Sequence, residues 1–238
     1  MNISGSGSLP GGDYNEDIRI SGSGKVNGNA ICDTMAVSGS GHVYGDLTCR
    51  GAMKVSGSGK VDGTLAASEL HVSGSCHIGG PAQIADSIGI SGSCHVGPVR
   101  CTELRVSGSL NAEGDVSAEN AEIKGKIECT GLINAGTLTV AFSGNCFADS
   151  IGGSVIEINM GRFGGGLISR FFMGERTFTV QNSIEGDKIN LQHVIADTVV
   201  GRDVVIGPGC KIRRVVYGEH IDISPEASVE YYEPSRTA

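Results

Sequence analysis

The sequence predicts an all-β protein folded as a single-stranded three-sided β-helix, or β-solenoid, of about 13 coils with 16–18 residues each. Three observations lead to this fold class. A short motif recurs at nearly constant spacing, and apolar or small residues occupy alternate positions between its copies. The chain also has 38 glycines and no tryptophan, so something other than large side chains must organise its interior.

The recurring motif is an apolar residue followed by Ser-Gly-Ser and usually by a small residue. Its copies begin at Ile3, Ile20, Val37, Val55, Val72, Ile90 and Val106. We expect the same register to continue, less clearly near Ile156, through Ile123, Val140, Ile156, Phe172, Ile189, Ile206 and Ile223. Repeats of this length are typical of stacked supersecondary units that bury their apolar faces against each other.

Within a coil, every second residue is apolar or small, as at Val37, Val43 and Leu47, and this is the period of a β-strand. A helix would need apolar spacing near 3.6, and each of several glycines per coil would cost it about 1 kcal/mol. A coil is only about 55–60 Å long at about 3.3 Å per residue, which fits three short sides joined by tight corners. Glycine at the inward corners leaves room for the other two sides and permits positive φ.

We expect one solenoid domain over 1–232, with regular coils at 3–155, an irregular segment at 156–178 and C-terminal coils at 179–232. A short polar tail, 233–238, follows it. The eight cysteines are expected to be free thiols. Repeat positions place Cys32 above Cys49, Cys76 above Cys94, and Cys129 above Cys146, each pair in an inward column where a free cysteine acts as a small hydrophobe.

Composition and charge exclude several classes of function. The formal net charge is -8 without runs of like charge, which disfavours nucleic acid as a partner. We find no secretion signal and no apolar stretch near the roughly 20 residues that cross a bilayer, so we expect a cytoplasmic protein that could lie at the inner face of the cell membrane. No cofactor is expected. A metal site is not expected either, although outward-facing His77 and His95 could form a weak two-ligand site.

With the repeat template SGSG-x-V-x-G established over Ile3 to Val140, the chain resembles the bactofilins, polymer-forming cytoskeletal proteins of bacteria. The resemblance implies a right-handed three-sided β-helix that polymerises end to end without a nucleotide. It also implies a scaffold beneath the cytoplasmic membrane for envelope, cell-shape or motility proteins. Many bactofilins have a shorter solenoid with disordered tails, and some reach the membrane through an apolar N-terminal tail. Here the first coil starts at Ile3, so we expect no such tail.

Both ends of the predicted stack lack an obvious cap, and terminal coils expose unpaired backbone groups. We therefore expect the chain to bind copies of itself by strand addition. The residues expected at this polymer interface occupy core positions of the first and last coils: Ile3, Leu9, Ile18, Ile221, Ile223, Val229 and Tyr231. The alternative is a capped monomer whose tail folds over one end.

The irregular segment combines apolar side chains with cations on an acidic protein, as a peripheral membrane or partner contact would require. The residues concerned are Arg162, Phe163, Leu167, Ile168, Arg170, Phe171, Phe172 and Met173. The alternative is that Phe172 and Phe178 fill a wider coil and the glycines form a bulge.

We expect no enzyme and assign no catalytic residue. The main alternative is a left-handed β-helix acyltransferase, because hexad spacing occurs over 200–212 and His193 and His220 lie near it. A carbohydrate-cleaving solenoid would need a stacked acidic cluster on one outward column, which we do not find. A hydrolase would need a G-x-S-x-G elbow, which is absent, and an ice-binding array would use regular threonine rather than serine.

Overall fold

The computed structural model describes residues 1–161 and 176–235. The chain forms two compact units, Met1–Ala118 (unit 1) and Glu119–Ala238 (unit 2). The described residues form no helix, and their strands pair in parallel as a β-solenoid of about 13 turns. The predicted fold class is therefore confirmed.

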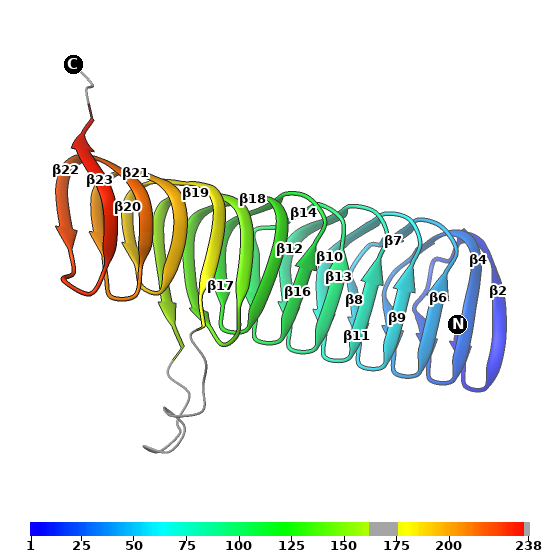
Figure 1. The fold of residues 1–238 in the computed structure, drawn as a ribbon. Coiled ribbons are helices and arrows are strands. Elements are labelled where there is room, and N and C mark those ends of the chain that lie inside the picture. The colour runs from blue at the N-terminus through cyan, green and yellow to red at the C-terminus, as the bar shows by residue number, and fades with distance from the viewer. Residues whose placement is uncertain (162–175, 236–238) are drawn as a thin grey trace, which may run out of the picture. The chain divides into compact units, whose positions relative to one another are not determined.

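Unit 1 consists of short strands that stack turn upon turn, coloured blue to green in Figure 1. Its strands are β1 (Asn2–Ile3), β2 (Ser6–Asp13), β3 (Ile18–Ile20), β4 (Ser23–Cys32), β5 (Met35–Val37), β6 (Ser40–Val43), β7 (Leu47–Cys49), β8 (Ala52–Val55), β9 (Ser58–Val61), β10 (Leu65–Val72), β11 (Ser75–Ile78), β12 (Ala82–Ile90), β13 (Ser93–Val96), β14 (Val99–Arg100), β15 (Glu103–Val106) and β16 (Ser109–Ala112). Strand β17 (Val116–Ile123) spans the boundary between the two units.

Three strands make one turn of unit 1. In the turn that starts at Met35, the strands are β5, β6 and β7, and they pair with β8, β9 and β10 of the next turn. The three strands are the three sides expected from the short perimeter of a coil. Polar corner residues separate them, so the chain changes direction without burying a charged side chain.

The register of unit 1 agrees with the motif. The first residue of each motif copy pairs with the first residue of the next, in the order Ile3, Ile20, Val37, Val55, Val72, Ile90 and Val106. All seven side chains are buried, with at most 8% of any of them exposed. The motif serines lie on the outside of the same turns, where most are exposed. The alternation of inward and outward positions is therefore confirmed for unit 1.

The role expected for the motif glycines was partly wrong. Positive φ occurs at other glycines, such as Gly28 and Gly114, and at none of the Ser-Gly-Ser motifs. The reason for glycine there is a close approach between turns. A Cβ atom placed on Gly74 would lie 2.0 Å from the carbonyl oxygen of Gly57, the equivalent residue one turn earlier.

Unit 2 has longer strands that continue around the corners, coloured green to red in Figure 1. They are β18 (Lys126–Phe142), β19 (Cys146–Met160), β20 (Phe178–Leu191), β21 (Val194–Ile206), β22 (Lys211–Ile223) and β23 (Ser228–Pro234). Each pairs in parallel with the next, and the register shifts within most of these pairings where the chain turns a corner. The core again consists of inward apolar side chains, among them Phe142 and Phe178, whose rings meet edge to face at 6.2 Å.

The register predicted for unit 2 was wrong in three places. Val140 pairs with Ile158 instead of Ile156, and Ile189 pairs with Val204 instead of Ile206. Ile156 pairs directly with Ile189, whereas Phe172, expected between them, lies outside the described residues. The cause is that two inward apolar residues stand two positions apart on each of these strands, which lets either one match the template.

Candidate assembly surfaces

Among the described residues, the strands of the first turn of unit 1 pair with a neighbouring turn on one side only. Strand β2 pairs with β4, and β1 pairs with β3. Leu9 pairs with Val26 and is half-buried, whereas Val26 has no exposed surface. Ile3 is buried, with 8% exposed, and Ile18 is completely buried against Met35. Of the three residues expected at this surface, Leu9 is therefore the most accessible and Ile18 is inaccessible.

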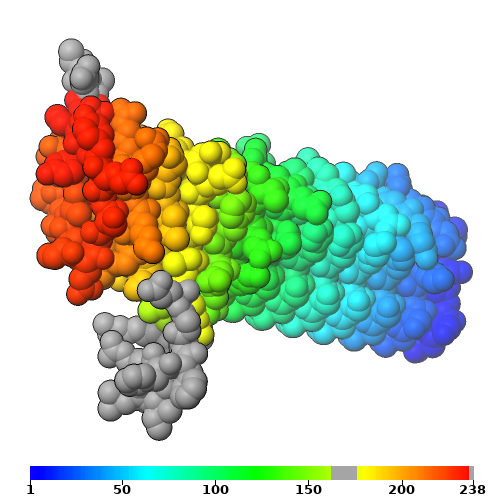
Figure 2. All heavy atoms as spheres, viewed as in Figure 1, coloured from blue at the N-terminus to red at the C-terminus, as the bar shows by residue number. Residues whose placement is uncertain are grey.

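The last turn of unit 2 has the same one-sided pairing. Strand β23 pairs with β22, and three inward residues of this region are half-exposed, namely Ile221, Ile223 and Val229. The residues beneath them, Val204, Ile206 and Ile212, are buried. Figure 2 shows the side chains of β22 and β23, in orange and red, at the surface of unit 2.

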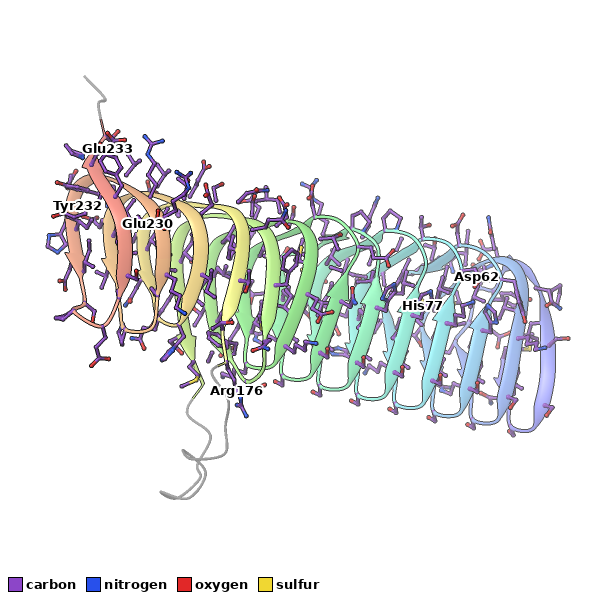
Figure 3. The ribbon with its side chains drawn as sticks, in the orientation of Figure 1. Asp62, His77, Arg176, Glu230, Tyr232 and Glu233 are labelled. Atoms are coloured by element: carbon purple, nitrogen blue, oxygen red, sulfur yellow. The ribbon has the colours of Figure 1, made fainter. Side chains whose placement is uncertain are left out.

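The expectation that Tyr231 points inward was wrong. Tyr231 pairs with the outward Arg214, and its hydroxyl donates a 3.0 Å hydrogen bond to Glu233. The inward column of Val215 is continued instead by Tyr232, which is 56% exposed (Figure 3). The reason is that Arg213 and Arg214 both point outward where β22 turns a corner, so the alternation skips one position there and in the paired strand β23. Such a polar pair inside an alternating strand is the sequence signal that would have identified Tyr232.

These two turns have the properties of open sheet edges. Interior turns bond to neighbours on both sides, whereas the outer backbone groups of β2 and β23 have no partner strand among the described residues. A strand edge with accessible apolar side chains can accept another strand, because the backbone supplies hydrogen bonds and the side chains supply buried area.

A surface groove of about 600 Å³ crosses five turns of unit 2. Arg213 donates a 2.7 Å hydrogen bond to Asp197 inside it. The residues that line the groove are Phe147, Thr179, Val180, Gln181, Ile195, Ala196, Asp197, Lys211, Ile212, Arg213, Ser228 and Glu230. It brings two acidic and two basic side chains together, so its charges are balanced.

We predict that the carboxyl group of Asp197 titrates at a pKa of about 2, below the usual 3.8, because Arg213 and then Thr198 donate hydrogen bonds to it. A lowered folded-state pKa stabilises the protein above the unfolded-state pKa, and this contribution is lost as the pH falls toward 2. The carboxyl carbon shift in an NMR titration measures it. Arg213→Gln should move the midpoint toward 3.8, whereas Arg214→Gln, whose partner is Glu233, should not. An unchanged midpoint in Arg213→Gln would contradict the assignment.

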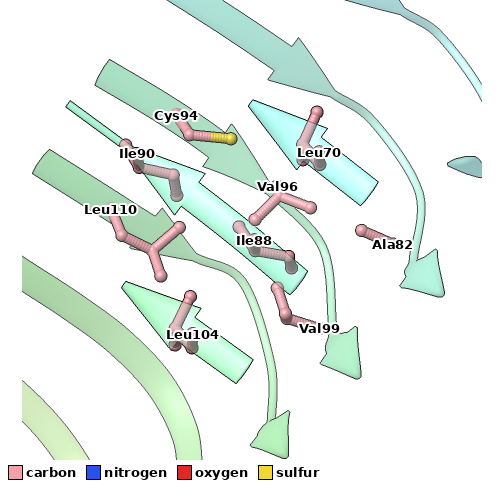
Figure 4. A pocket seen from close by; sticks show the side chains of 9 residues that line it. All are labelled: Leu70, Ala82, Ile88, Ile90, Cys94, Val96, Val99, Leu104 and Leu110. Carbon is pink, nitrogen blue, oxygen red and sulfur yellow. The ribbon is translucent and has the colours of Figure 1, made fainter. Parts of the chain in front are cut away.

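The described part of unit 1 contains a small internal cavity of about 10 Å³ (Figure 4). All of its lining side chains are apolar or thiol: Leu70, Ala82, Ile88, Ile90, Cys94, Val96, Val99, Leu104 and Leu110. A space of this size holds at most one water, and an apolar lining offers such a water no hydrogen bonds. We therefore interpret the cavity as a packing defect of the core.

The side chains of the two outward histidines, His77 and His95, are in contact. The rings of His77 and His95 stack at 4.8 Å with an angle of 9° between their planes, and the Nε2 atom of His95 lies 3.2 Å from Glu113. His77 lies on the outer face of β11 (Figure 3). Within residues 1–161 and 176–235, no three His, Cys, Asp or Glu side chains are grouped as a metal site requires.

The cysteines are free thiols and are buried. Cys32 pairs with Cys49, and Cys76 pairs with Cys94, as predicted. The prediction for the third pair was wrong. Cys129 pairs with Ala148 and Cys146 pairs with Phe178, because the register of unit 2 is displaced by two residues relative to the template. Burial raises the pKa of Cys101 to about 12, which keeps this thiol protonated and unreactive.

The residues named for the acyltransferase alternative lie on different parts of unit 2. His193 stands between β20 and β21 with φ at 54°, and its backbone N–H donates a 3.0 Å hydrogen bond to Pro208. His220 is exposed on β22 and pairs with Asp203.

The eight residues expected to contact a membrane or partner lie outside the described residues. They are Arg162, Phe163, Leu167, Ile168, Arg170, Phe171, Phe172 and Met173.

The family model Bactofilin, described as polymer-forming cytoskeletal, matches residues 2–83. Residues 2–83 form a bactofilin domain. This bactofilin domain lies within unit 1, and it includes the one-sided turn with Leu9. The C-terminal turn of unit 2, with Val229 and Tyr232, lies outside the matched residues.

Two curated proteins of Bacillus subtilis (strain 168) are similar to the chain. Uncharacterized protein YhbE is 33% identical over 102 residues, and uncharacterized protein YhbF is 28% identical over 101 residues. Each match covers 42% of this chain, and the chain spans 42% of YhbE and 40% of YhbF. No solved structure matches the chain.

In the part of the chain that the structure describes, no helix has both the length and the apolar character needed to span a membrane.

Proposed function

We propose that the protein is a structural scaffold that assembles end to end into filaments without a nucleotide, as a cytoskeletal element. The observation that carries this proposal is the pair of one-sided turns, where the half-exposed core residues Leu9 and Val229 stand beside unpaired strand edges. A stacked copy would bury these side chains and extend the parallel sheet.

The family match supports the same function, because its description is a polymer-forming cytoskeletal domain. End-to-end contact between unlike surfaces generates an open filament, whereas contact between like surfaces forms closed pairs at each junction. Both arrangements make unbranched polymers from a chain with two binding ends. A location at the inner face of the cell membrane and contacts with envelope or motility proteins remain predictions from the sequence and the resemblance.

We predict that Val229→Glu abolishes long filaments, because a carboxylate at an inward position of the last turn would be buried without a partner when another copy stacks on it. Negative-stain electron microscopy and sedimentation velocity of the purified full chain measure the result. Ser228→Glu is the matched control, since Ser228 is exposed on the same strand and pairs with Lys211.

The size of the Val229→Glu particles distinguishes the two kinds of junction. Single chains indicate that unlike ends meet, whereas pairs indicate that the N-terminal turns still associate with each other. Filaments of unchanged length in Val229→Glu, or an unaltered chain that sediments as a monomer at all concentrations, would contradict the proposal.

A further inference from the structure

Two cysteines and two methionines occupy buried inward positions on either side of one corner of unit 1. Cys32 ends β4 and Met35 begins β5, with two residues between them. One turn later, Cys49 ends β7 and Met53 lies in β8, so the same corner again holds a cysteine and a methionine. Both pairs repeat at nearly the same spacing in the sequence.

The strand register brings these side chains together. Cys32 is the direct partner of Cys49, and Met35 is the direct partner of Met53. The two thiol Sγ atoms lie 3.7 Å apart. All four residues are at most 3% exposed, so no solvent reaches the cluster.

The side chains stacked above and below the cluster are aliphatic, so the sulfur atoms are the most polarisable groups inside this corner. On one side Met35 stacks on the buried Ile18, and on the other Met53 stacks on the buried Leu70. The short corner segment of Asp33 and Thr34 separates the cluster from solvent, and Arg50 binds Asp33 on the outside.

The two thiols differ in acidity. The hydrogen bond between them lowers the pKa of Cys32 and raises that of Cys49 strongly, and burial raises the pKa of Cys49 further. In the buried core both thiols are stable in their neutral, protonated form, and a thiolate needs a cation beside it.

We propose that this cluster is a binding site for one soft monovalent cation, Cu(I) or Ag(I), held between the Cys32 and Cys49 sulfurs with the Met35 and Met53 thioethers as further ligands. Binding replaces one thiol proton, which leaves to solvent, and forms a metal–sulfur bond. The metal keeps its oxidation state, so no electron is transferred, and the metal with one thiolate is neutral.

Ligand type and geometry favour this class of ion. Thiolates and thioethers are soft ligands that select Cu(I), whereas zinc takes four ligands from Cys, His, Asp and Glu and does not use methionine. At the metal–sulfur distance of about 2.3 Å known from zinc–thiolate sites, two sulfurs on opposite sides of an ion are about 4.6 Å apart. The observed 3.7 Å is shorter, so the S–metal–S angle is bent or the pair opens by less than about 1 Å.

Titration of the reduced full chain with Cu(I) under anaerobic conditions, against a chromophoric Cu(I) chelator, tests the site. The unaltered chain should bind one equivalent, and Cys32→Ala/Cys49→Ala should lose it. The matched control is Cys76→Ala/Cys94→Ala, because this pair is also stacked in unit 1 but has no methionine among the neighbours that share its columns. It should retain the equivalent. Met35→Leu/Met53→Leu, which preserves volume, should weaken binding by about tenfold.

X-ray absorption at the copper edge, measured on the unaltered chain, provides a readout that needs no variant to fold. Sulfur-only coordination supports the site, and nitrogen or oxygen ligands overturn it. The proposal is also overturned if the unaltered chain does not compete with the chelator. Binding that survives in Cys32→Ala/Cys49→Ala, or that is lost equally in Cys76→Ala/Cys94→Ala, overturns it as well.

Discussion

Replacing Gly74 by alanine is expected to destabilise unit 1 by about 2–4 kcal/mol, because the new methyl group overlaps the backbone of the preceding turn. Its Cβ atom would lie 2.0 Å from the carbonyl oxygen of Gly57 and 2.5 Å from that of Ser56. The turn cannot move away freely, because the Gly57 carbonyl accepts a 2.9 Å hydrogen bond from the backbone of Ser75. Urea unfolding followed by far-ultraviolet circular dichroism in the Val229→Glu background, where assembly is blocked, measures the change.

Gly5 provides a control at the same motif position. A Cβ atom on Gly5 meets nothing within 4 Å, since no described turn precedes it, so Gly5→Ala should change stability by less than about 0.5 kcal/mol.

The Gly5→Ala variant, in an otherwise unaltered chain, also tests the proposed assembly. A copy stacked on this turn in the register of the interior would place a carbonyl oxygen against the new methyl group and prevent filament growth. Gly5→Ala filaments equal to those of the unaltered chain would show that this turn is not covered in that way. Equal stability of Gly74→Ala and Gly5→Ala would refute the packing argument itself.

The sequence predicted the register of unit 1 because its motif is asymmetric. The Ser-Gly-Ser segment occurs once per turn, so a shift by one residue would turn its serines inward, and a shift by two would set its glycines against the apolar residues of the next turn. In unit 2 the motif is replaced by inward pairs such as Ile156 and Ile158, and either member fits the template. Only the paired backbone of the folded chain shows which residue of the next turn each one meets.

The burial and orientation of the residues at the two candidate assembly surfaces were predicted in part for a related reason. Leu9 and Val229 stand on straight strand segments where alternation holds, and both are accessible core positions. Tyr231 and Tyr232 follow a corner, where two successive residues point outward, so strict alternation selected the wrong tyrosine. Ile18 was predicted correctly as a core residue, but the sequence alone could not show that it is fully covered.

Phe178→Ala is expected to destabilise unit 2 by about 3–5 kcal/mol, the cost of removing a large buried aromatic side chain. Phe178 is completely buried at the start of β20, where it pairs with Cys146 on one side and Val194 on the other. Its ring also contacts Phe142 edge to face, an arrangement that contributes about 0.5–1.5 kcal/mol beyond the buried area. Chemical unfolding in the assembly-blocked background measures the total.

Phe147→Ala is the matched control, because Phe147 lies beside Cys146 on the same strand but points outward and is half-buried. Its removal should cost about 1 kcal/mol or less. Since each turn contacts mainly its neighbours, the loss at Phe178 should appear as faster hydrogen exchange in β19, β20 and β21, with the strands of unit 1 unchanged. A cost at Phe178 no larger than that at Phe147 would mean that the edge-to-face pair is not the anchor of this part of the core. Faster exchange spread evenly over both units would mean that the chain unfolds as one cooperative block rather than turn by turn.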